Sequence, residues 1–127
     1  MIRALTTLLN VANGERTARF YCDKLGFRID NRFDTDAGLM WAQLSCGGVR
    51  LMINVSAEYA ARPPREDART YDDVVLHFAV DDARALHQEL TQLGLAPGPV
   101  ERQAYGLYEF TLRDPDGYEL AFGSPAH

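Results

Sequence analysis

Residues 4–27 read ALTTLLNVANGERTARFYCDKLGF, and they join a strand pattern to a helix pattern in one short segment. Residues 4–11 are apolar and threonine-rich at the length of a strand. Asn13 is a favoured N-cap, because its side-chain oxygen can accept a hydrogen bond from the first helical turn. Apolar residues then recur at helical spacing up to Leu25, and Gly26 is suited to a left-handed C-cap. The segment predicts a strand that leads directly into a helix.

The residues after this helix predict three more strands. Phe27, Ile29 and Phe33 follow a two-residue period within residues 27–33, although Asn31 interrupts the apolar series. Residues 40–45 and 49–55 then form a hairpin pattern around a turn that contains Gly47 and Gly48. The first part of the chain therefore reads β-α-β-β-β.

The second half of the chain repeats this order. Residues 74–80 predict a strand, Asp81 or Asp82 a helix N-cap, and Leu93 the end of the helix, which Gly94 closes. Glycines and leucines recur at an offset of 68 positions, as in the pairs Gly26 and Gly94, Gly38 and Gly106, and Leu44 and Leu112. The offset becomes 69 at Leu51 and Leu120, which is explained if the Asp114-Pro115-Asp116-Gly117 turn is one residue longer than its counterpart.

The repeat predicts an α+β fold. Two β-α-β-β-β modules, at about 1–55 and 74–127, are joined by a polar, proline-containing connection at about 56–73. Each module alone is short of hydrophobic core, so we expect residues 1–127 to form a single domain. We expect the two mixed sheets to form a cupped or half-barrel pocket.

Composition narrows the function classes. The net charge of −5 and the lack of a basic run disfavour a nucleic-acid binder. Residues 1–5 do not begin a signal-peptide pattern, and no apolar stretch is long enough to span a membrane. Cys22 and Cys46 are too few for a disulfide framework. We therefore expect a cytoplasmic protein without nucleic-acid or membrane partners.

The motifs together resemble the vicinal oxygen chelate superfamily. The resemblance lies in Asn13 followed by Phe20-Tyr21 and Leu25-Gly26-Phe27, in Val80-Asp81-Asp82 and in Asp114-Pro115-Asp116-Gly117-Tyr118, and it covers nearly the whole chain. The superfamily includes glyoxalase I, extradiol dioxygenases, fosfomycin-resistance enzymes and bleomycin-resistance proteins. Because one fold serves several activities, the resemblance implies the two-module fold and leaves the chemistry to individual residues.

Metal-dependent members take His, Glu or Gln ligands from the first and last strands of each module. The corresponding positions here are Thr6, Met52, Val75 and Ala121. None is a usual ligand of a hard divalent ion, which binds through nitrogen and oxygen donors. The resemblance therefore implies a protein that works without a metal cofactor.

Two nearby residues keep a metal-dependent alternative open. His77 and Glu119 have ligand chemistry and should face the cup, but they are displaced in opposite directions from the family positions. If the two strands are parallel neighbours, we expect these residues to lie four positions apart, roughly 13 Å. His77 could also be a hydrogen-bonded pocket residue and Glu119 the partner of an arginine. We expect His87 to be solvated on the second helix.

Strand alternation predicts the residues that line the cup. They are Trp41, Gln43, Arg50 and Met52 in the first module and His77, Glu109 and Glu119 in the second. Tyr105, which precedes Gly106, is a further candidate, because this pair could admit a ligand or simply permit a tight bend. An aromatic face with a few polar groups suits a planar or cationic organic molecule, and Trp41 is the best candidate for stacking.

The first functional hypothesis is therefore a metal-free, bleomycin-resistance-like protein that sequesters such a molecule. The alternative is a lyase or extradiol-type dioxygenase in which His77 and Glu119 hold a divalent metal in an atypical site. A third is a catalytically silent interaction domain. The resemblance also implies a homodimer.

Overall fold

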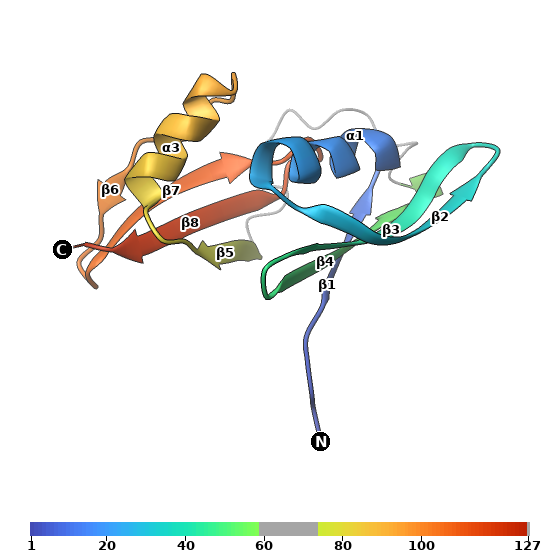
Figure 1. The fold of residues 1–127 in the computed structure, drawn as a ribbon, viewed down its shortest axis with the longest axis horizontal. Helices are drawn as coiled ribbons and strands as arrows, with labels where there is room; N and C mark the ends of the chain where they lie inside the picture. The colour runs from blue at the N-terminus through green and yellow to red at the C-terminus, as the bar shows by residue number, and fades with distance from the viewer. Residues whose placement is uncertain (59–73, 127) are drawn as a thin grey trace. The chain divides into compact units, whose positions relative to one another are not determined.

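A computed structural model describes residues 1–58 and 74–126, which fall into two compact units, one in each range. The first unit contains β1 (Thr7–Val11), α1 (Gly14–Arg19), the π-helix η1 (Phe20–Lys24), β2 (Arg28–Thr35), β3 (Gly38–Cys46) and β4 (Val49–Val55). The second contains β5 (Val75–Ala79), α3 (Ala83–Gln92), β6 (Glu101–Arg102), β7 (Leu107–Arg113) and β8 (Glu119–Pro125). The α+β class and the β-α-β-β-β order of both modules are confirmed (Figure 1).

The two sheets have the same topology. The first has the strand order β1-β4-β3-β2 and the second the order β5-β8-β7-β6. In each unit the first and last strands are parallel neighbours, and the remaining neighbours are antiparallel. Both sheets are therefore mixed and open.

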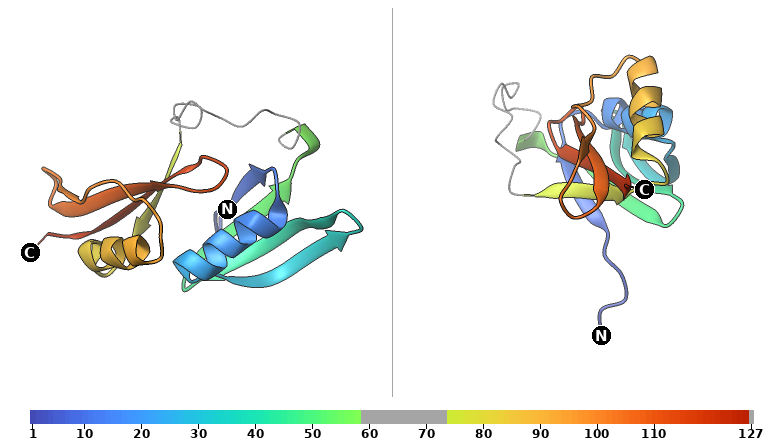
Figure 2. Two further views of the ribbon diagram at one scale, coloured as in Figure 1. Left: turned by 90° about the horizontal axis from the view of Figure 1, so that it is seen from above. Right: turned by 90° about the vertical axis from the view of Figure 1, so that its left-hand side faces the viewer.

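In the first unit, α1 covers one face of the sheet (Figures 1 and 2). Alternate residues of β3 and β4 are buried beneath it: Ala42, Leu44, Leu51 and Ile53. The intervening residues of both strands therefore lie on the opposite face, away from α1.

In the second unit, α3 packs on β7 and β8. The rings of Phe110 and Phe122 stack with centroids 5.0 Å apart, and His87 of α3 meets Phe110 edge-on at 5.2 Å. Ser124 of β8 accepts a buried hydrogen bond from the Ala83 backbone N–H at 2.8 Å, which ties the start of α3 to the sheet. The opposite face of this sheet is not covered by α3.

The predicted helix caps are confirmed in both units. The Asn13 side chain accepts a hydrogen bond from the Arg16 N–H at 3.0 Å, and Asp82 accepts one from Ala85 at 3.1 Å. Gly26 and Gly94 follow the two helices with φ of 78° and 88°, a left-handed conformation that favours glycine.

The first helix differs from the prediction in its last turn. The segment Phe20–Lys24 is a π-helix rather than a continuation of α1. Within it, the buried Tyr21 ring packs edge-on against Phe20 at 5.2 Å and Phe27 at 5.6 Å. The Phe27 N–H closes the segment by donating to the Tyr21 carbonyl at 3.0 Å. The wider turn accommodates this aromatic cluster, which spacing alone does not reveal.

The turns and strand ends also follow the sequence closely. The Gly117 N–H donates to the Asp114 carbonyl at 3.0 Å, which confirms the predicted tight turn. Strand β1 begins at Thr7 rather than at residue 4, and the preceding residues extend away from it and expose Ile2 and Leu5 (Figure 1). Most of the predicted connection, at 59–73, lies outside the described residues, and the single-domain arrangement stays a prediction.

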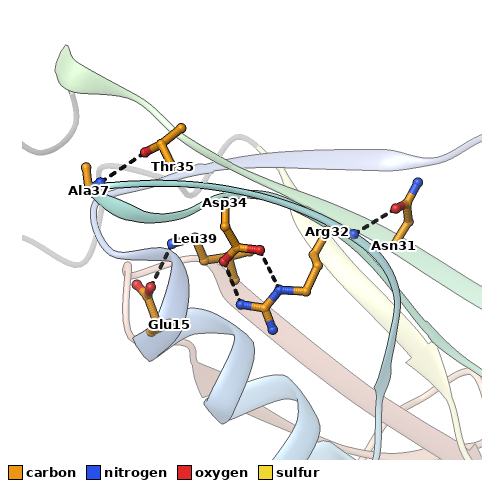
Figure 3. A network of polar contacts seen from close by, with 7 residues as sticks. All are labelled: Glu15, Asn31, Arg32, Asp34, Thr35, Ala37 and Leu39. Carbon is orange, nitrogen blue, oxygen red and sulfur yellow. Dashed lines mark hydrogen bonds and ion pairs between the residues drawn. The ribbon is translucent and has the colours of Figure 1, made fainter.

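A side-chain contact joins α1 to the hairpin of the first sheet (Figure 3). Glu15 Oε1 accepts a hydrogen bond from the Leu39 backbone N–H at 2.7 Å, and this bond lowers the pKa of the Glu15 carboxyl. Beside it, Arg32 and Asp34 form a two-bond ion pair at 2.8 Å. The β2–β3 hairpin is therefore tied to the first turn of α1.

Candidate functional site

In each unit, we call the sheet face opposite α1 or α3 the helix-free face. In the first sheet this face carries the first group of predicted ligand residues. Trp41 and Gln43 lie on β3, where they alternate with the buried Ala42 and Leu44. Gln43 is paired across strands with Met52 of β4. The three residues are half-buried and therefore retain exposed surface.

The sequence reasoning missed an aromatic neighbour on this face. Phe33 of β2 is paired with Trp41 in the strand register, so both rings lie on the same side of the sheet. Phe33 is 60% exposed, and Leu8, which is paired with Met52, is 47% exposed. The two-residue period of the strand indicated Phe33, but its position beside Trp41 depends on a register with two bulges.

Polar groups occupy one end of the same face. Arg50 is exposed and is paired with Ser45. Arg28 donates to Ser45 Oγ at 3.2 Å and to Asp30 Oδ1 at 3.0 Å. Hydrogen bonding from Ser45, with a smaller contribution from Arg28, lowers the pKa of Asp30. The face is thus aromatic and apolar around Trp41 and charged around Arg50.

The helix-free face of the second sheet brings three of the predicted residues together. His77 Nε2 lies 3.0 Å from Glu109 Oε1, and the Tyr105 hydroxyl donates to Glu109 Oε2 at 2.6 Å. The bonds from Tyr105 and then His77 lower the pKa of Glu109, and the bond to Glu109 raises the pKa of Tyr105. Each carboxylate oxygen of Glu109 therefore has a hydrogen-bond partner, and the Glu109 side chain is only 14% exposed.

Gly123 makes room for this arrangement. It lies in β8 beside Ala79 and Glu109 in the register. A Cβ at position 123 would stand 3.0 Å from Cε1 of His77 and 3.2 Å from Cγ of Glu109. The glycine therefore lets the imidazole approach the sheet closely, while the His77 side chain remains 45% exposed.

Glu119 does not join this group. It lies 3.9 Å from Arg113 of the neighbouring strand, the arginine pairing that the sequence left open. The expected separation of His77 and Glu119 was wrong: β5 pairs Val75 with Glu119, so His77 is offset from Glu119 by two positions, roughly 7 Å, rather than four. The error came from assuming that Val75 and Ala121 are register partners, whereas Ala121 is paired with His77.

Comparison with known proteins identifies the family. The profile of the Glyoxalase/Bleomycin resistance protein/Dioxygenase superfamily matches residues 3–122. The chain belongs to this superfamily. No curated protein sequence matched it.

Solved structures share the fold of the superfamily. A bleomycin resistance determinant encoded on transposon Tn5 superposes with a TM-score of 0.74 at 21% identity, over 98% of both chains. An antibiotic-binding protein from Streptomyces sp. CB03234 gives 0.73 at 20% identity, over 99% of this chain and 98% of that one. A lactoylglutathione lyase from Agrobacterium tumefaciens gives 0.72 at 20% identity, over 96% and 92%. Identities this low show the fold alone, and both binding proteins and an enzyme have it.

The residues that the family resemblance assigned to the metal-ligand positions carry no strong donor side chain. Thr6 precedes β1, Met52 lies in β4, Val75 begins β5 and Ala121 lies in β8. Their hydroxyl, thioether and aliphatic side chains do not fit a hard divalent ion. Across residues 1–58 and 74–126, no three His, Cys, Asp or Glu side chains gather where they could hold a metal.

Other candidate residues have structural environments. His87 is half-buried rather than solvated, because Nε2 lies 2.9 Å from the Gly98 carbonyl and the ring packs on Phe110. Burial raises the pKa of the Cys22 thiol, which opposes a nucleophilic role. Within the described parts of the chain, no helix is both long enough and apolar enough to cross a membrane.

Proposed function

We propose that this protein binds a small planar organic molecule, of neutral or cationic character, and sequesters it without chemical change. The observation that carries the proposal is the pair of Trp41 and Phe33 on the helix-free face of the first sheet. Phe33 is exposed and Trp41 is half-buried, and aromatic side chains that neighbour each other on a sheet offer a surface on which a ring system can stack. The antibiotic-binding and bleomycin-resistance proteins of the same fold agree with this proposal.

The residues around the aromatic pair supply adaptability and polarity. Met52 is flexible and polarisable, so its side chain can adjust to the edge of a ligand. Gln43 offers both hydrogen-bond donors and an acceptor beside it. A cation gains further attraction over the indole face, which is the strongest cation-π surface among side chains.

Trp41 provides a direct test, because it is the single tryptophan of the chain. Titration with a panel of planar antibiotics and metabolites, bleomycin among them, should change the tryptophan fluorescence in a saturable manner. The same molecules should raise the melting temperature, because a ligand that binds only the native state stabilises it. If no member of the panel affects either signal, the proposal is contradicted and the silent interaction domain is favoured.

Matched variants connect the signal to the aromatic pair. Phe33→Leu keeps the fluorophore and should weaken binding about tenfold, the effect of losing a stacking contact of roughly 1.4 kcal/mol. Leu93→Ala removes an exposed apolar side chain at the end of α3 and serves as the control. Equal affinity of the Phe33 and Leu93 variants would show that the ligand binds elsewhere.

We further propose that binding requires no metal. The absence of strong donors at Thr6, Met52, Val75 and Ala121 supports this. His77 and Glu119 also have separate partners, which are Glu109 and Arg113. The competing proposal, a lyase or dioxygenase that uses His77 and Glu119, requires both side chains to leave these partners. Metal analysis of the purified protein tests it: stoichiometric Zn, Ni, Mn or Fe that is lost in His77→Ala would favour the enzyme.

A further inference from the structure

The hydrogen bonds around His77 determine which ring nitrogen carries the proton. Glu109 accepts from the Tyr105 hydroxyl at Oε2 and faces His77 Nε2 through Oε1. An ionised carboxylate can only accept, so a neutral imidazole in this contact must carry its proton on Nε2. The other nitrogen, Nδ1, is then an acceptor, and within residues 1–58 and 74–126 the hydrogen bond to Glu109 is the only one that the His77 ring makes.

The surroundings hold the ring in place while leaving part of it open. The Cε1–Nε2 edge rests where a side chain at Gly123 would stand, whereas the His77 side chain as a whole is 45% exposed. Tyr105 is 66% exposed beside it. The Glu109 side chain is only 14% exposed and its two oxygens bond His77 and Tyr105, so it acts through them as a positioning residue rather than by touching a ligand.

We propose that Nδ1 of His77 accepts a hydrogen bond from an N–H or O–H group of the ligand on the helix-free face of the second sheet. This goes beyond the proposed function, because His77 belongs to the second unit, and it names the chemical group that a ligand of this face must carry. The preferred ligand is an aromatic amidine, a protonated amine or a phenol. The Glu109 carboxylate behind the ring makes Nδ1 a stronger acceptor and favours positively charged donors.

Two probes of equal charge and similar shape test the proposal. Benzamidine is a planar aromatic cation with N–H donors, and phenyltrimethylammonium is an aromatic cation without any. With the full ¹⁵N-labelled chain at a pH where the ring is neutral, Nε2 should be the protonated nitrogen. Benzamidine should shift the Nδ1 resonance and bind about tenfold more tightly than phenyltrimethylammonium, the ratio expected for one charge-assisted hydrogen bond.

Variants assign this preference to the ring. His77→Phe retains an aromatic side chain and should bind the two probes equally. Glu109→Gln can donate its amide to Nε2, which moves the ring proton to Nδ1, so the preference for benzamidine should disappear. Glu89→Gln removes a carboxylate from the exposed surface of α3 and should behave as wild type. Gly123→Ala should displace the ring and reduce the preference, with the melting temperature reporting whether the variant folds.

Three results would overturn the proposal: a neutral ring with its proton on Nδ1, a failure of benzamidine to perturb His77, or a preference that survives in His77→Phe. The outcome is separable from that of the proposed function, which is read from Trp41 in the other unit. If no molecule of the panel changes the Trp41 fluorescence while His77 still distinguishes the two probes, sequestration at the aromatic pair is refuted. The proposed hydrogen bond to Nδ1 of His77 then stands by itself.

Discussion

At the scale of single residues, side chains often act differently from what their local pattern indicates. Glu15 lies in the first turn of α1, where a negative charge is favourable, and its carboxylate also accepts the Leu39 N–H across the fold (Figure 3). His87 was expected to be solvated, yet its Nε2 lies 2.9 Å from the Gly98 carbonyl oxygen. Each partner lies at least 11 positions away in the sequence, so helical spacing cannot reveal it.

Glu15→Gln should destabilise the first unit at neutral pH. The amide can still accept from Leu39, but a charged acceptor bonds more strongly. Because the folded-state pKa of Glu15 lies below its ordinary value of 4.5, its stabilising contribution is present above 4.5 and is lost as the pH falls through the lower folded value. Urea unfolding of both proteins should therefore show a gap at pH 7 that narrows in acid.

Asp36→Asn is the control for the loss of charge. Asp36 lies in the adjacent turn, so its substitution removes one negative charge and leaves the bond between Glu15 and Leu39 in place. A stability gap for Glu15→Gln that is constant from pH 7 down to pH 2 would contradict the assigned role.

At the scale of elements, the helix boundaries were the most predictable features. Asn13 and Asp82 occupy matching cap positions, and both hydrogen bonds are within three residues of the cap. Such bonds depend on side-chain chemistry and local backbone geometry, which the sequence displays directly. The π-helical turn was not predictable, since it depends on packing of Phe20, Tyr21 and Phe27.

Removal of either cap should cost about 1 kcal/mol of unfolding free energy, the usual effect of replacing an Asn or Asp cap with alanine. The variants are Asn13→Ala and Asp82→Ala, measured by urea denaturation with far-ultraviolet circular dichroism. Asn13→Asp and Asp82→Asn keep a side-chain acceptor and should retain most of the stability. Equal losses in the alanine and the exchanged variants would show that the cap hydrogen bonds contribute nothing.

At the scale of the whole molecule, the repeat explains the architecture. Two units of identical strand order arise from one sequence pattern read twice. Each sheet has one face that α1 or α3 does not cover, and on the first sheet this face exposes Leu8 and Phe33. The strands at the ends of each sheet, such as β2 and β6, also carry backbone groups that can pair with another chain.

We predict that the protein forms a homodimer. Burial of apolar surface and of strand edges both favour association. Sedimentation velocity should give a mass near twice the 14.2 kDa of the chain. A monomer across working concentrations would remove the prediction. Phe33→Lys would place a charge on the exposed face of the first sheet and show whether that face takes part.

The sequence by itself determined the order of strands and helices, their caps and turns, and the family, because these depend on local backbone preferences and on spacing along the chain. Tertiary structure alone decided which side chains meet. His77 lies against Glu109 rather than Glu119, and Phe33 lies beside Trp41. Both depend on strand register, which is set by bulges and by packing between distant segments. When the register between two strands shifts by two positions, each side chain stays on the same face but meets different neighbours. The two-residue alternation in the sequence is the same in both registers.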